Sequence, residues 1–346
     1  MSNNQHKFLI VYPLTVGEIP RALSMLAAVL KKEGFEVKTA VNTFKKPLRV
    51  PDYVNIAKEW GATHVGISMY TLQVLEAYEI AKAMKEIGVT VVLGGAHPSS
   101  HPVEGIQHGA DIVVRGEGED TLKELCRFWK GEKVETSNRS MTMLTAENMD
   151  KANENFAMKR VNETSASRKL EEKIPEELIE NDLSKIKSIT FRDEKTGKII
   201  STPPRTLIGK LDDLPTPVHD IFDDDAFTVN GVVRDHHRLY TTRGCPGRCT
   251  YCNSGVFGSK IRVYSPDTIV ERIREVVNEH GITNFNIADD NFTSKKSHVE
   301  GMCNAIKREF PDVTWRVNSR VDMVNPEMLA MMKDAGCYMI SYGIES

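Results

Sequence analysis

Short apolar runs alternate with helical patterns through the first 130 residues of the chain. Between the first two runs, Leu23, Leu26 and Leu30 recur at helical spacing after Pro20, and Gly34 follows where a helix would end. The alternation predicts an α/β domain, a doubly wound, Rossmann-like parallel sheet with helices between its strands. The five runs expected to form its strands are Phe8–Tyr12, Phe35–Val41, His64–Met69, Val89–Leu93 and Ile112–Val114.

The pattern changes after residue 131. Residues 132–185 are dense in Glu, Lys, Asn and Ser and lack a sustained apolar face, so we expect a polar insert, disordered or helical and solvated. Ile186–Phe191 and Lys198–Ser201 flank a turn at 193–197 and predict a hairpin. Leu211–Pro217 then reads as an extended linker, because each proline biases the preceding residue away from helix.

Alternation of strands and helices resumes near Arg238. Four further runs have strand character, and apolar positions at helical spacing lie between them. Four parallel strands do not close a barrel, and the chain stops directly after the fourth run, so we expect a partial barrel and a fragment of a longer protein. The expected domains are 1–131, Rossmann-like; 132–185, insert; 186–235, hairpin and linker; and 236–346, partial barrel.

Composition narrows the class of protein. The chain has 346 residues, 40% hydrophobic and 27% charged, which suits two globular domains. A net charge of -3 gives no general attraction to nucleic acid, and no apolar stretch approaches the length of a membrane span. We therefore expect a cytoplasmic protein that acts on small molecules.

Three of the six cysteines carry the strongest chemical signal. Cys245, Cys249 and Cys252 lie in a loop made tight by glycine and proline, and three such thiolates leave one iron of a cubane cluster open. A zinc site would need a fourth ligand, for which His236, His237 or Cys303 are candidates, and inert thiols on a turn are the other alternative. The close spacing favours the cluster, and Cys126, Cys303 and Cys337 are expected to be buried thiols.

The CxxxCxxC motif, with Tyr251 before its third cysteine and after the first strand of a partial barrel, resembles the radical S-adenosylmethionine (SAM) superfamily. The resemblance implies a [4Fe-4S] cluster held by the three cysteines, with the open iron chelating SAM for reductive cleavage to a 5'-deoxyadenosyl radical. It places Tyr251 against the adenine, the Asp289, Asp290 and Asn291 turn near the methionine end, and Glu345 on the ribose. From the residues alone, that turn could equally cap a helix, and Arg320 with Asp322 could form an ion pair or bind a ligand.

Glycine-rich and hydroxyl-bearing turns follow the expected strands of the first domain. They include Ser68–Thr71, Gly94–Pro98 and Gly116–Glu119, at the carboxyl ends where such sheets bind ligands. The chain has no GxGxxG or GxxxxGK[ST] motif, which weakens dinucleotide and P-loop interpretations.

These turns resemble the cobalamin-binding domain that precedes many radical SAM barrels. The resemblance implies that Ser68, Thr71, Gly94 and Gly95 leave room for the dimethylbenzimidazole tail. The DxHxxG motif is absent, so no histidine from that motif is expected on cobalt. His97 is either a turn residue or a neighbour of the corrin, and a scaffold that no longer binds cofactor is a further alternative.

Together, the two resemblances imply a cobalamin-dependent radical SAM enzyme that methylates an unactivated carbon and is reduced by a partner such as flavodoxin or ferredoxin. Two alternatives remain open. One is a radical SAM cyclase or rearrangement enzyme that uses cobalamin without donating its methyl group. The other is a non-catalytic fragment that carries an iron-sulfur cluster or a corrinoid.

Overall fold

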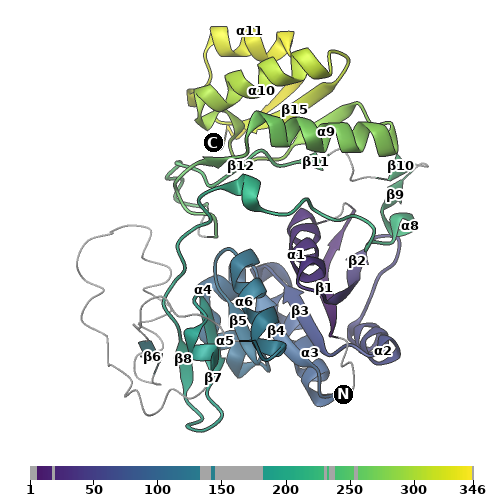
Figure 1. The fold of residues 1–346 in the computed structure, drawn as a ribbon, viewed down its shortest axis with the longest axis vertical. Helices are drawn as coiled ribbons and strands as arrows, with labels where there is room; N and C mark the ends of the chain where they lie inside the picture. Colours follow the sequence, from purple (N-terminus) through teal and green to yellow (C-terminus); the bar gives the residue numbers. More distant parts are fainter. Residues whose placement is uncertain are drawn as a thin grey trace. The chain divides into compact units, whose positions relative to one another are not determined.

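The computed structural model describes residues 6–17, 20–132, 142–144, 182–229, 232–233, 238–252 and 256–344. The chain divides into two compact units (Figure 1). The first unit is Met1–Thr206 with Pro217–Ala226, and the second unit is Leu207–Thr216 with Phe227–Ser346. Most of the polar insert expected over 132–185 lies outside the described residues.

An eight-stranded sheet forms the centre of the first unit, in the order β2-β1-β3-β4-β5-β7-β8-β6. The first five strands are parallel, as predicted, and the last three join antiparallel. Their order 2-1-3-4-5 is the flavodoxin-like arrangement, which binds ligands at the carboxyl ends of the strands. The strands are β1 (Lys7–Val16), β2 (Glu36–Thr43), β3 (His64–Ser68), β4 (Thr90–Gly94), β5 (Ile112–Val114), β6 (Thr142–Leu144), β7 (Ile189–Arg192) and β8 (Ile199–Ser201).

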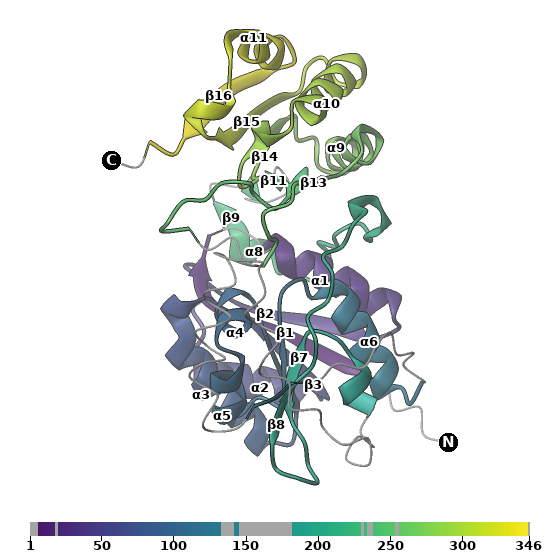
Figure 2. The same cartoon turned by 90° about the vertical axis from the view of Figure 1, so that its left-hand side faces the viewer.

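Helices cover both faces of this sheet, because its parallel strands are apolar on both sides. On one face lie α1 (Arg21–Lys32) and α6 (Glu119–Trp129) (Figure 2). On the other lie α2 (Val50–Trp60), α3 (Val74–Glu86) and α5 (Pro102–Gln107), which share a core with β1, β3 and β4. The short helix α4 (Ala96–Ser100) and the 3-10 turns η1 (Thr71–Gln73) and η4 (Asp182–Lys185) complete this unit.

The predicted hairpin is confirmed, and it extends the first sheet beyond β5. Arg115, at the end of β5, is buried, and its guanidinium donates to the carbonyl oxygens of Ile189 and Thr202. Its backbone N–H also donates to Ser188 at 2.8 Å. The sequence pattern identified the hairpin but not its attachment, since pairing across 70 residues leaves no local signal.

The expected linker contributes to both units. Leu211, in the 3-10 turn η5 (Leu211–Asp213), is fully buried in the core of the second unit. Asp212 accepts hydrogen bonds from Ser265 at the start of a helix in that unit. Residues 217–226 then return to the first unit, where the Val218 N–H donates to Ser24.

The second unit contains a parallel sheet in the order β11-β14-β15-β16. Its strands are β11 (Arg238–Leu239), β14 (Asn284–Ile287), β15 (Thr314–Ser319) and β16 (Cys337–Tyr342). These confirm the four predicted strands, except that the first ends at Leu239 and a separate pair, β12 (Thr242–Arg243) and β13 (Arg262–Val263), brackets the cysteine loop. Other short elements are α8 (Asp224–Phe227), β9 (Thr228–Val229) and β10 (Val232–Val233).

Three helices cover one face of this sheet: α9 (Pro266–His280), α10 (Lys296–Glu309) and α11 (Pro326–Asp334). Apolar side chains such as Phe285 and Trp315 alternate along the strands and pack in this core. The intervening positions carry Asn286, Arg316 and Asn318, so the opposite face is polar. The 3-10 turns η6 (Phe292–Ser294) and η7 (Val321–Met323) follow β14 and β15.

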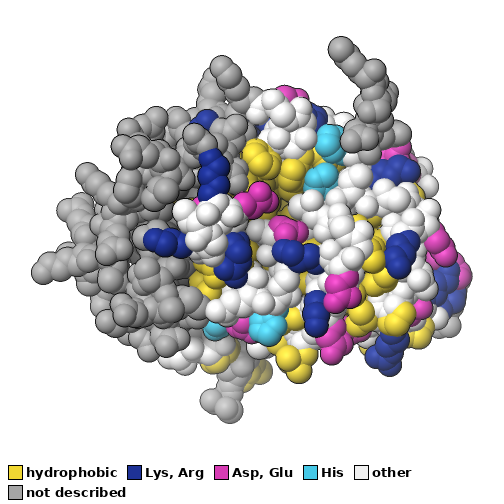
Figure 3. Space-filling model, turned by 90° about the horizontal axis from the view of Figure 1, so that it is seen from below, with side chains coloured by type: hydrophobic (Ala, Val, Ile, Leu, Met, Phe, Trp, Pro, Cys, Tyr) yellow, Lys and Arg dark blue, Asp and Glu magenta, His cyan; other side chains and the backbone are white. Residues whose placement is uncertain are grey.

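The described surface seen from below mixes charges of both signs (Figure 3). Lys and Arg side chains lie among Asp and Glu side chains there, with apolar side chains between them. Among the described residues, no helix has the length and apolar character required to cross a membrane.

Candidate functional site

The cysteine loop leaves β12 through a glycine that no other residue could replace without strain. Gly244 has φ +87°, and a Cβ added to it would clash with the carbonyl oxygen of Lys260. The Cys245 N–H donates to Gly258 at 3.2 Å, and the Cys252 N–H donates to Cys249 at 3.1 Å. These bonds close the loop on itself and onto the segment that returns to β13.

Gly247 lies between two of the thiols. A Cβ added there would sit 3.3 Å from the Cys245 Sγ and 3.8 Å from the Cys249 Sγ, so a side chain would fill the space that these sulfurs border. Cys245 and Cys249 are half-buried, Cys252 is exposed, and none forms a disulfide. Two thiols of the CxxxCxxC loop that border a space kept open by glycine, with the third cysteine exposed in the same loop, fit a cubane cluster with one open iron.

The zinc alternative finds less support in this geometry. Ligands of one tetrahedral zinc ion lie about 3.3–3.8 Å apart, given Zn–N and Zn–S bonds of about 2.0–2.3 Å. In the described part of the chain, the three cysteines are not among the groups whose ligand atoms all lie within 4.8 Å of one another. Cys303, a suggested fourth ligand, is 2% exposed in the core of the second unit, where burial raises its pKa to about 12. His236 and His237 lie outside the described residues.

Asp289 holds the strand end that leads into the cysteine loop. One carboxylate oxygen accepts from the N–H groups of Thr241 at 2.7 Å and Thr242 at 3.0 Å, and the other accepts from the Thr241 hydroxyl. The same hydroxyl lies 2.8 Å from Nε2 of the buried His298, whose pKa burial lowers to about 4. Burial also raises the pKa of Asp289 to about 6, against the lowering effect of its hydrogen bonds. A neutral His298 can therefore donate its Nε2–H to Thr241 while Thr241 donates to Asp289.

Three further residues of the predicted SAM-binding set, Tyr251, Asp290 and Asn291, belong to the described part of the chain. Asn291 is buried, and its amide nitrogen donates to the Met323 sulfur at 3.1 Å, while Asp290 is exposed. Tyr251, in the cysteine loop, is 65% exposed. Asn291 occupies the N-cap position of η6 without a capping hydrogen bond from its side chain, but its carbonyl accepts from the Ser294 N–H and hydroxyl, so the turn of the structural alternative is present and the side-chain cap is not. Glu345 lies outside the described residues, and its role stays a prediction.

Arg320 is a site residue whose role the sequence did not resolve. Its guanidinium forms a bidentate ion pair with the Asp322 carboxylate, with N–O distances of 2.9 and 2.7 Å. Its Nη1 also donates a hydrogen bond to the Cys249 Sγ at 3.1 Å. Hydrogen bonding to Asp322, with a smaller effect of Cys249, raises the pKa of Arg320, and Arg320 lowers the pKa of Asp322. Its place at the carboxyl end of β15 was the available signal, but only the fold brings it to the cysteine loop.

In the first unit, the predicted cobalamin residues meet at the carboxyl ends of β3 and β4. Ser68 pairs with Gly94 in the strand register, and the Met69 N–H donates to the Gly94 carbonyl at 3.0 Å. Gly95 has φ +107°, and a Cβ there would lie 2.7 Å from the Met69 carbonyl oxygen. At Gly94, by contrast, an added Cβ would meet nothing within 4 Å, so open space adjoins this backbone.

Hydrogen bonds tie these turns to their neighbours. The Ser99 hydroxyl donates to Gly95 at 2.7 Å and accepts from the Gly116 N–H at 3.0 Å. Thr71 is exposed, and its hydroxyl lies 3.1 Å from Nδ1 of His97. Large apolar side chains are exposed on the segments that follow β2 and β3, a concentration unusual for solvent-facing positions. They are Phe44 (78%), Tyr70 (50%), Leu72 (90%) and Leu75 (77%).

Comparisons with known proteins agree with both halves of this picture. The B12-binding domain family matches residues 14–126, and the radical SAM superfamily matches residues 239–346. An uncharacterized methyltransferase of Pyrococcus horikoshii is 29% identical over 98% of the chain. Cytidylyl-2-hydroxyethylphosphonate methyltransferase of Streptomyces wedmorensis is 27% identical over 94% of the chain. The chain spans 65% and 61% of the lengths of these two relatives.

A solved structure shares the fold. The radical S-adenosylmethionine methyltransferase TsrM from Kitasatospora setae, with cobalamin and a [4Fe-4S] cluster bound, superposes with a TM-score of 0.65 at 18% identity. The match covers 98% of this chain and 59% of TsrM. The chain thus combines a B12-binding domain with a domain of the radical SAM superfamily, the two families that its sequence motifs resemble.

Proposed function

We propose that this chain belongs to a cobalamin-dependent radical SAM enzyme that methylates an unactivated carbon of a small molecule. The observation that carries the proposal is the open space at Gly247, bordered by two thiols of a CxxxCxxC loop and by the Arg320 guanidinium. A B12-binding domain on the same chain supports the choice of methylation among radical SAM reactions. The two relatives described above are both named as methyltransferases.

Cys245, Cys249 and Cys252 would hold the cluster, and Ser68, Thr71, Gly94 and Gly95 would line the site for the cobalamin tail. When bound, the cluster supplies the electron that cleaves SAM, and cobalamin supplies the methyl group that is transferred. The open space beside Gly94 and the exposed apolar side chains after β2 and β3 support a large, partly apolar ligand at this end of the first unit. Tyr251, Asp290, Asn291 and Glu345 would bind SAM.

In this proposal Asp289 and Arg320 do not contact SAM and act through neighbouring residues of the cysteine loop. Both oxygens of Asp289 are engaged by Thr241 and Thr242, so this carboxylate would position the cysteine loop and reach SAM only through that loop. Arg320 would keep a positive charge and a donor on the Cys249 sulfur, which stabilises the more electron-rich form of an iron-sulfur cluster. Asp322 fixes the orientation of that guanidinium.

The electron would come from a small carrier such as flavodoxin or ferredoxin, and we place the reaction in the cytoplasm. Radical cyclisation or rearrangement, in which cobalamin keeps its methyl group, is the alternative chemistry. A labelled methyl group distinguishes the two, because only methylation transfers it to the product.

The test is anaerobic reconstitution of the full chain with iron and sulfide. We expect about four irons per chain, an absorption spectrum that changes when SAM is added, and 5'-deoxyadenosine after reduction. The triple variant Cys245→Ala, Cys249→Ala, Cys252→Ala should lose both the iron and the 5'-deoxyadenosine. The other three cysteines of the chain are buried and cannot replace the loop thiols as cluster ligands. Cys126→Ala, which removes a buried thiol of the first unit, is the matched control.

Retention of iron by the triple variant would refute the cluster assignment. A cluster that forms but yields no 5'-deoxyadenosine would favour the non-catalytic carrier. Corrinoid binding is a separate readout, because it depends on the first unit.

A further inference from the structure

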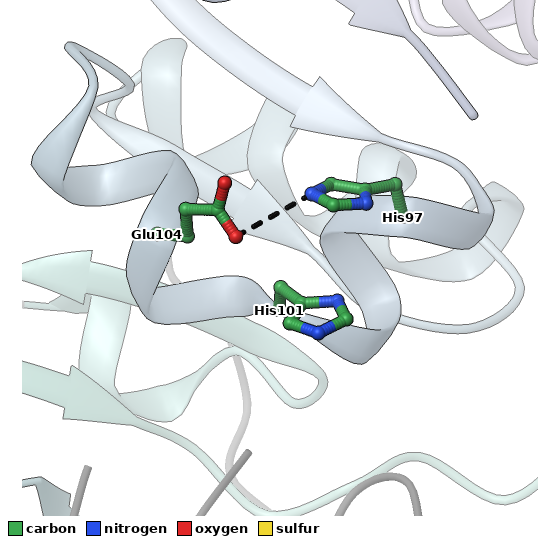
Figure 4. Close-up of side chains that lie close together, drawn as sticks. All are labelled: His97, His101 and Glu104. Atoms are coloured by element: carbon green, nitrogen blue, oxygen red, sulfur yellow. Dashed lines mark ion pairs between the residues drawn. The ribbon is translucent and has the colours of Figure 1, made fainter. Parts of the chain in front are cut away.

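Two histidines and a glutamate converge beside the Gly94–Gly95 turn of the first unit (Figure 4). His97 lies on α4, His101 at the junction of α4 and α5, and Glu104 on α5. One ligand atom from each lies within 4.8 Å of those of the other two, and no other group of three such side chains in the described residues meets this criterion. Nε2 of His97 is 3.6 Å from the Glu104 carboxylate, and the two imidazoles stack with centroids 4.8 Å apart.

The orientation of His97 is set by its other nitrogen. Nδ1 lies 3.1 Å from the Thr71 hydroxyl, which directs Nε2 toward Glu104. A histidine that binds metal through one nitrogen typically has the other fixed by a hydrogen bond in the same way. In the tautomer whose Nδ1–H donates to the Thr71 hydroxyl, Nε2 of His97 carries the lone pair that a metal ligand requires.

Buried nitrogens in this cluster lack partners. His97 is 6% exposed, yet its Nε2 has no hydrogen-bond partner within the described part of the chain, and neither has the buried Nδ1 of His101. Leaving such a polar atom unsatisfied in a buried position destabilises the fold. An unsatisfied Nε2 of His97 that faces the Glu104 carboxylate, with a second unsatisfied nitrogen on the neighbouring His101, indicates room for a metal ion, which accepts lone pairs.

An internal ion pair explains the cluster less well. The 3.6 Å separation between His97 and Glu104 exceeds a hydrogen bond. Burial lowers the pKa of His97, against the opposing effect of Glu104, and this favours the neutral imidazole that binds metals. An ion pair would also leave the His101 nitrogen unsatisfied.

We propose that His97, His101 and Glu104 bind one divalent transition-metal ion of the zinc class. Two imidazole nitrogens and one carboxylate oxygen form a familiar donor set for zinc, with water or another ligand completing the coordination. Cobalt in a corrin could use only one of these donors, so the cluster is a site for a separate ion. The ion would connect α4 and α5 to Thr71 after β3, and so fix the turn that contains Gly95.

Direct binding of Zn²⁺ to the untagged full chain tests this proposal. The chain carries Cys245→Ser, Cys249→Ser and Cys252→Ser so that the loop thiols do not compete. Burial raises the pKa of Cys126 and Cys303 to about 12 and that of Cys337 to about 11, so these thiols stay protonated. Equilibrium dialysis should give one His97-dependent zinc ion per chain, and Co²⁺ in its place should show visible bands without the thiolate charge-transfer absorption.

Three single variants in this background locate the ion. His97→Ala and Glu104→Gln should each weaken zinc binding by at least about tenfold, the loss that follows removal of even a supporting partner of a metal ligand. His108→Ala is the matched control, because His108 lies just after α5 and stacks on Tyr78 outside the cluster. It should bind zinc like the parent.

Equal zinc affinity in Glu104→Gln and His108→Ala would overturn the proposal, as would the absence of stoichiometric binding by the parent. Glu104→Gln keeps the shape of a partly exposed side chain, so it decides the matter if circular dichroism shows that His97→Ala misfolds.

Discussion

Arg320 directly follows β15, the third strand of the second sheet, and contacts the cysteine loop. It donates to the Cys249 sulfur while Asp322 fixes its guanidinium in two hydrogen bonds. An isolated exposed ion pair contributes little to stability. We therefore expect the Arg320–Asp322 pair to matter mainly because it holds a positive charge beside the Cys249 sulfur.

We expect Arg320→Ala to lower iron retention by about tenfold and to make the reduction potential of the reconstituted cluster more negative. The physical reason is that the variant removes a charged donor from a ligand sulfur. A redox titration followed by electron paramagnetic resonance measures the second effect. Arg308→Ala, an exposed arginine of α10 that pairs with Glu309, is the control. An unchanged potential in Arg320→Ala would contradict the role proposed for this side chain.

Gly94 and Gly95 are adjacent, but we expect substitutions at the two positions to have different effects on stability. Gly95→Ala should destabilise the first unit by about 1–3 kcal/mol from its φ of +107° alone, with a further cost from the contact with the Met69 carbonyl. Gly94→Ala should leave stability nearly unchanged because nothing lies within 4 Å of the added carbon. Gly94→Leu should instead weaken cobalamin binding by about tenfold or more, for which a loss of 1.4 kcal/mol suffices. Urea unfolding and corrinoid binding measure the two effects, and full affinity in Gly94→Leu would remove Gly94 from the cofactor site.

At the scale of elements, the sequence predicted the helices and strands, because these depend mainly on residues that are close together in the chain. The strands of both sheets were predictable because apolar runs of strand length alternate with helical spacing, and Gly34 ended α1 with φ +83° as expected. The attachment of the hairpin through Arg115 and the approach of Arg320 to Cys249 were not predictable. Each joins residues more than 70 positions apart, and nothing in the neighbouring sequence encodes such a pairing.

The connection between β14 and the start of the cysteine loop has a predictable dependence on pH. The pKa of Asp289 is raised to about 6, so the folded protein holds this proton at pH values where the unfolded chain, with a pKa near 3.8, has lost it. Stability conferred at this site must then fall as the pH rises from about 4 to 6 and stay level above that range. Asp289→Asn lacks the titration, so the stability of the parent relative to this variant should fall by up to roughly 3 kcal/mol over the same interval.

Trp315 can report this transition. It is fully buried in the core of the second unit, and replacing Trp60 and Trp129 of the first unit by Phe leaves it the one tryptophan of the chain. Urea unfolding followed by its fluorescence at several pH values gives the difference between parent and Asp289→Asn. Parallel profiles from pH 4 to 7 would mean that Asp289 ionises as it does in water.

For the whole molecule, the division into two units separates the two chemistries. Each unit has its own core, built from different strands and helices. The residues proposed for cobalamin all belong to the first unit, and the cluster cysteines all belong to the second. A ligand that binds only one unit should therefore protect that unit selectively.

Hydrogen exchange measures this selectivity. A ligand that binds only the folded state stabilises it by RT ln(1 + [L]/Kd), about 2.7 kcal/mol at 100 times Kd. Cobalamin at that concentration should slow the slowest amides of β3 and β4 by about 100-fold, because they exchange only when the first unit opens. Amides of β14 and β15 should exchange as before, since none of the proposed cobalamin residues lies in the second unit. Equal protection of both units would mean that residues of the second unit also hold the cofactor, and no protection of β3 and β4 would exclude the site at Ser68 and Gly94.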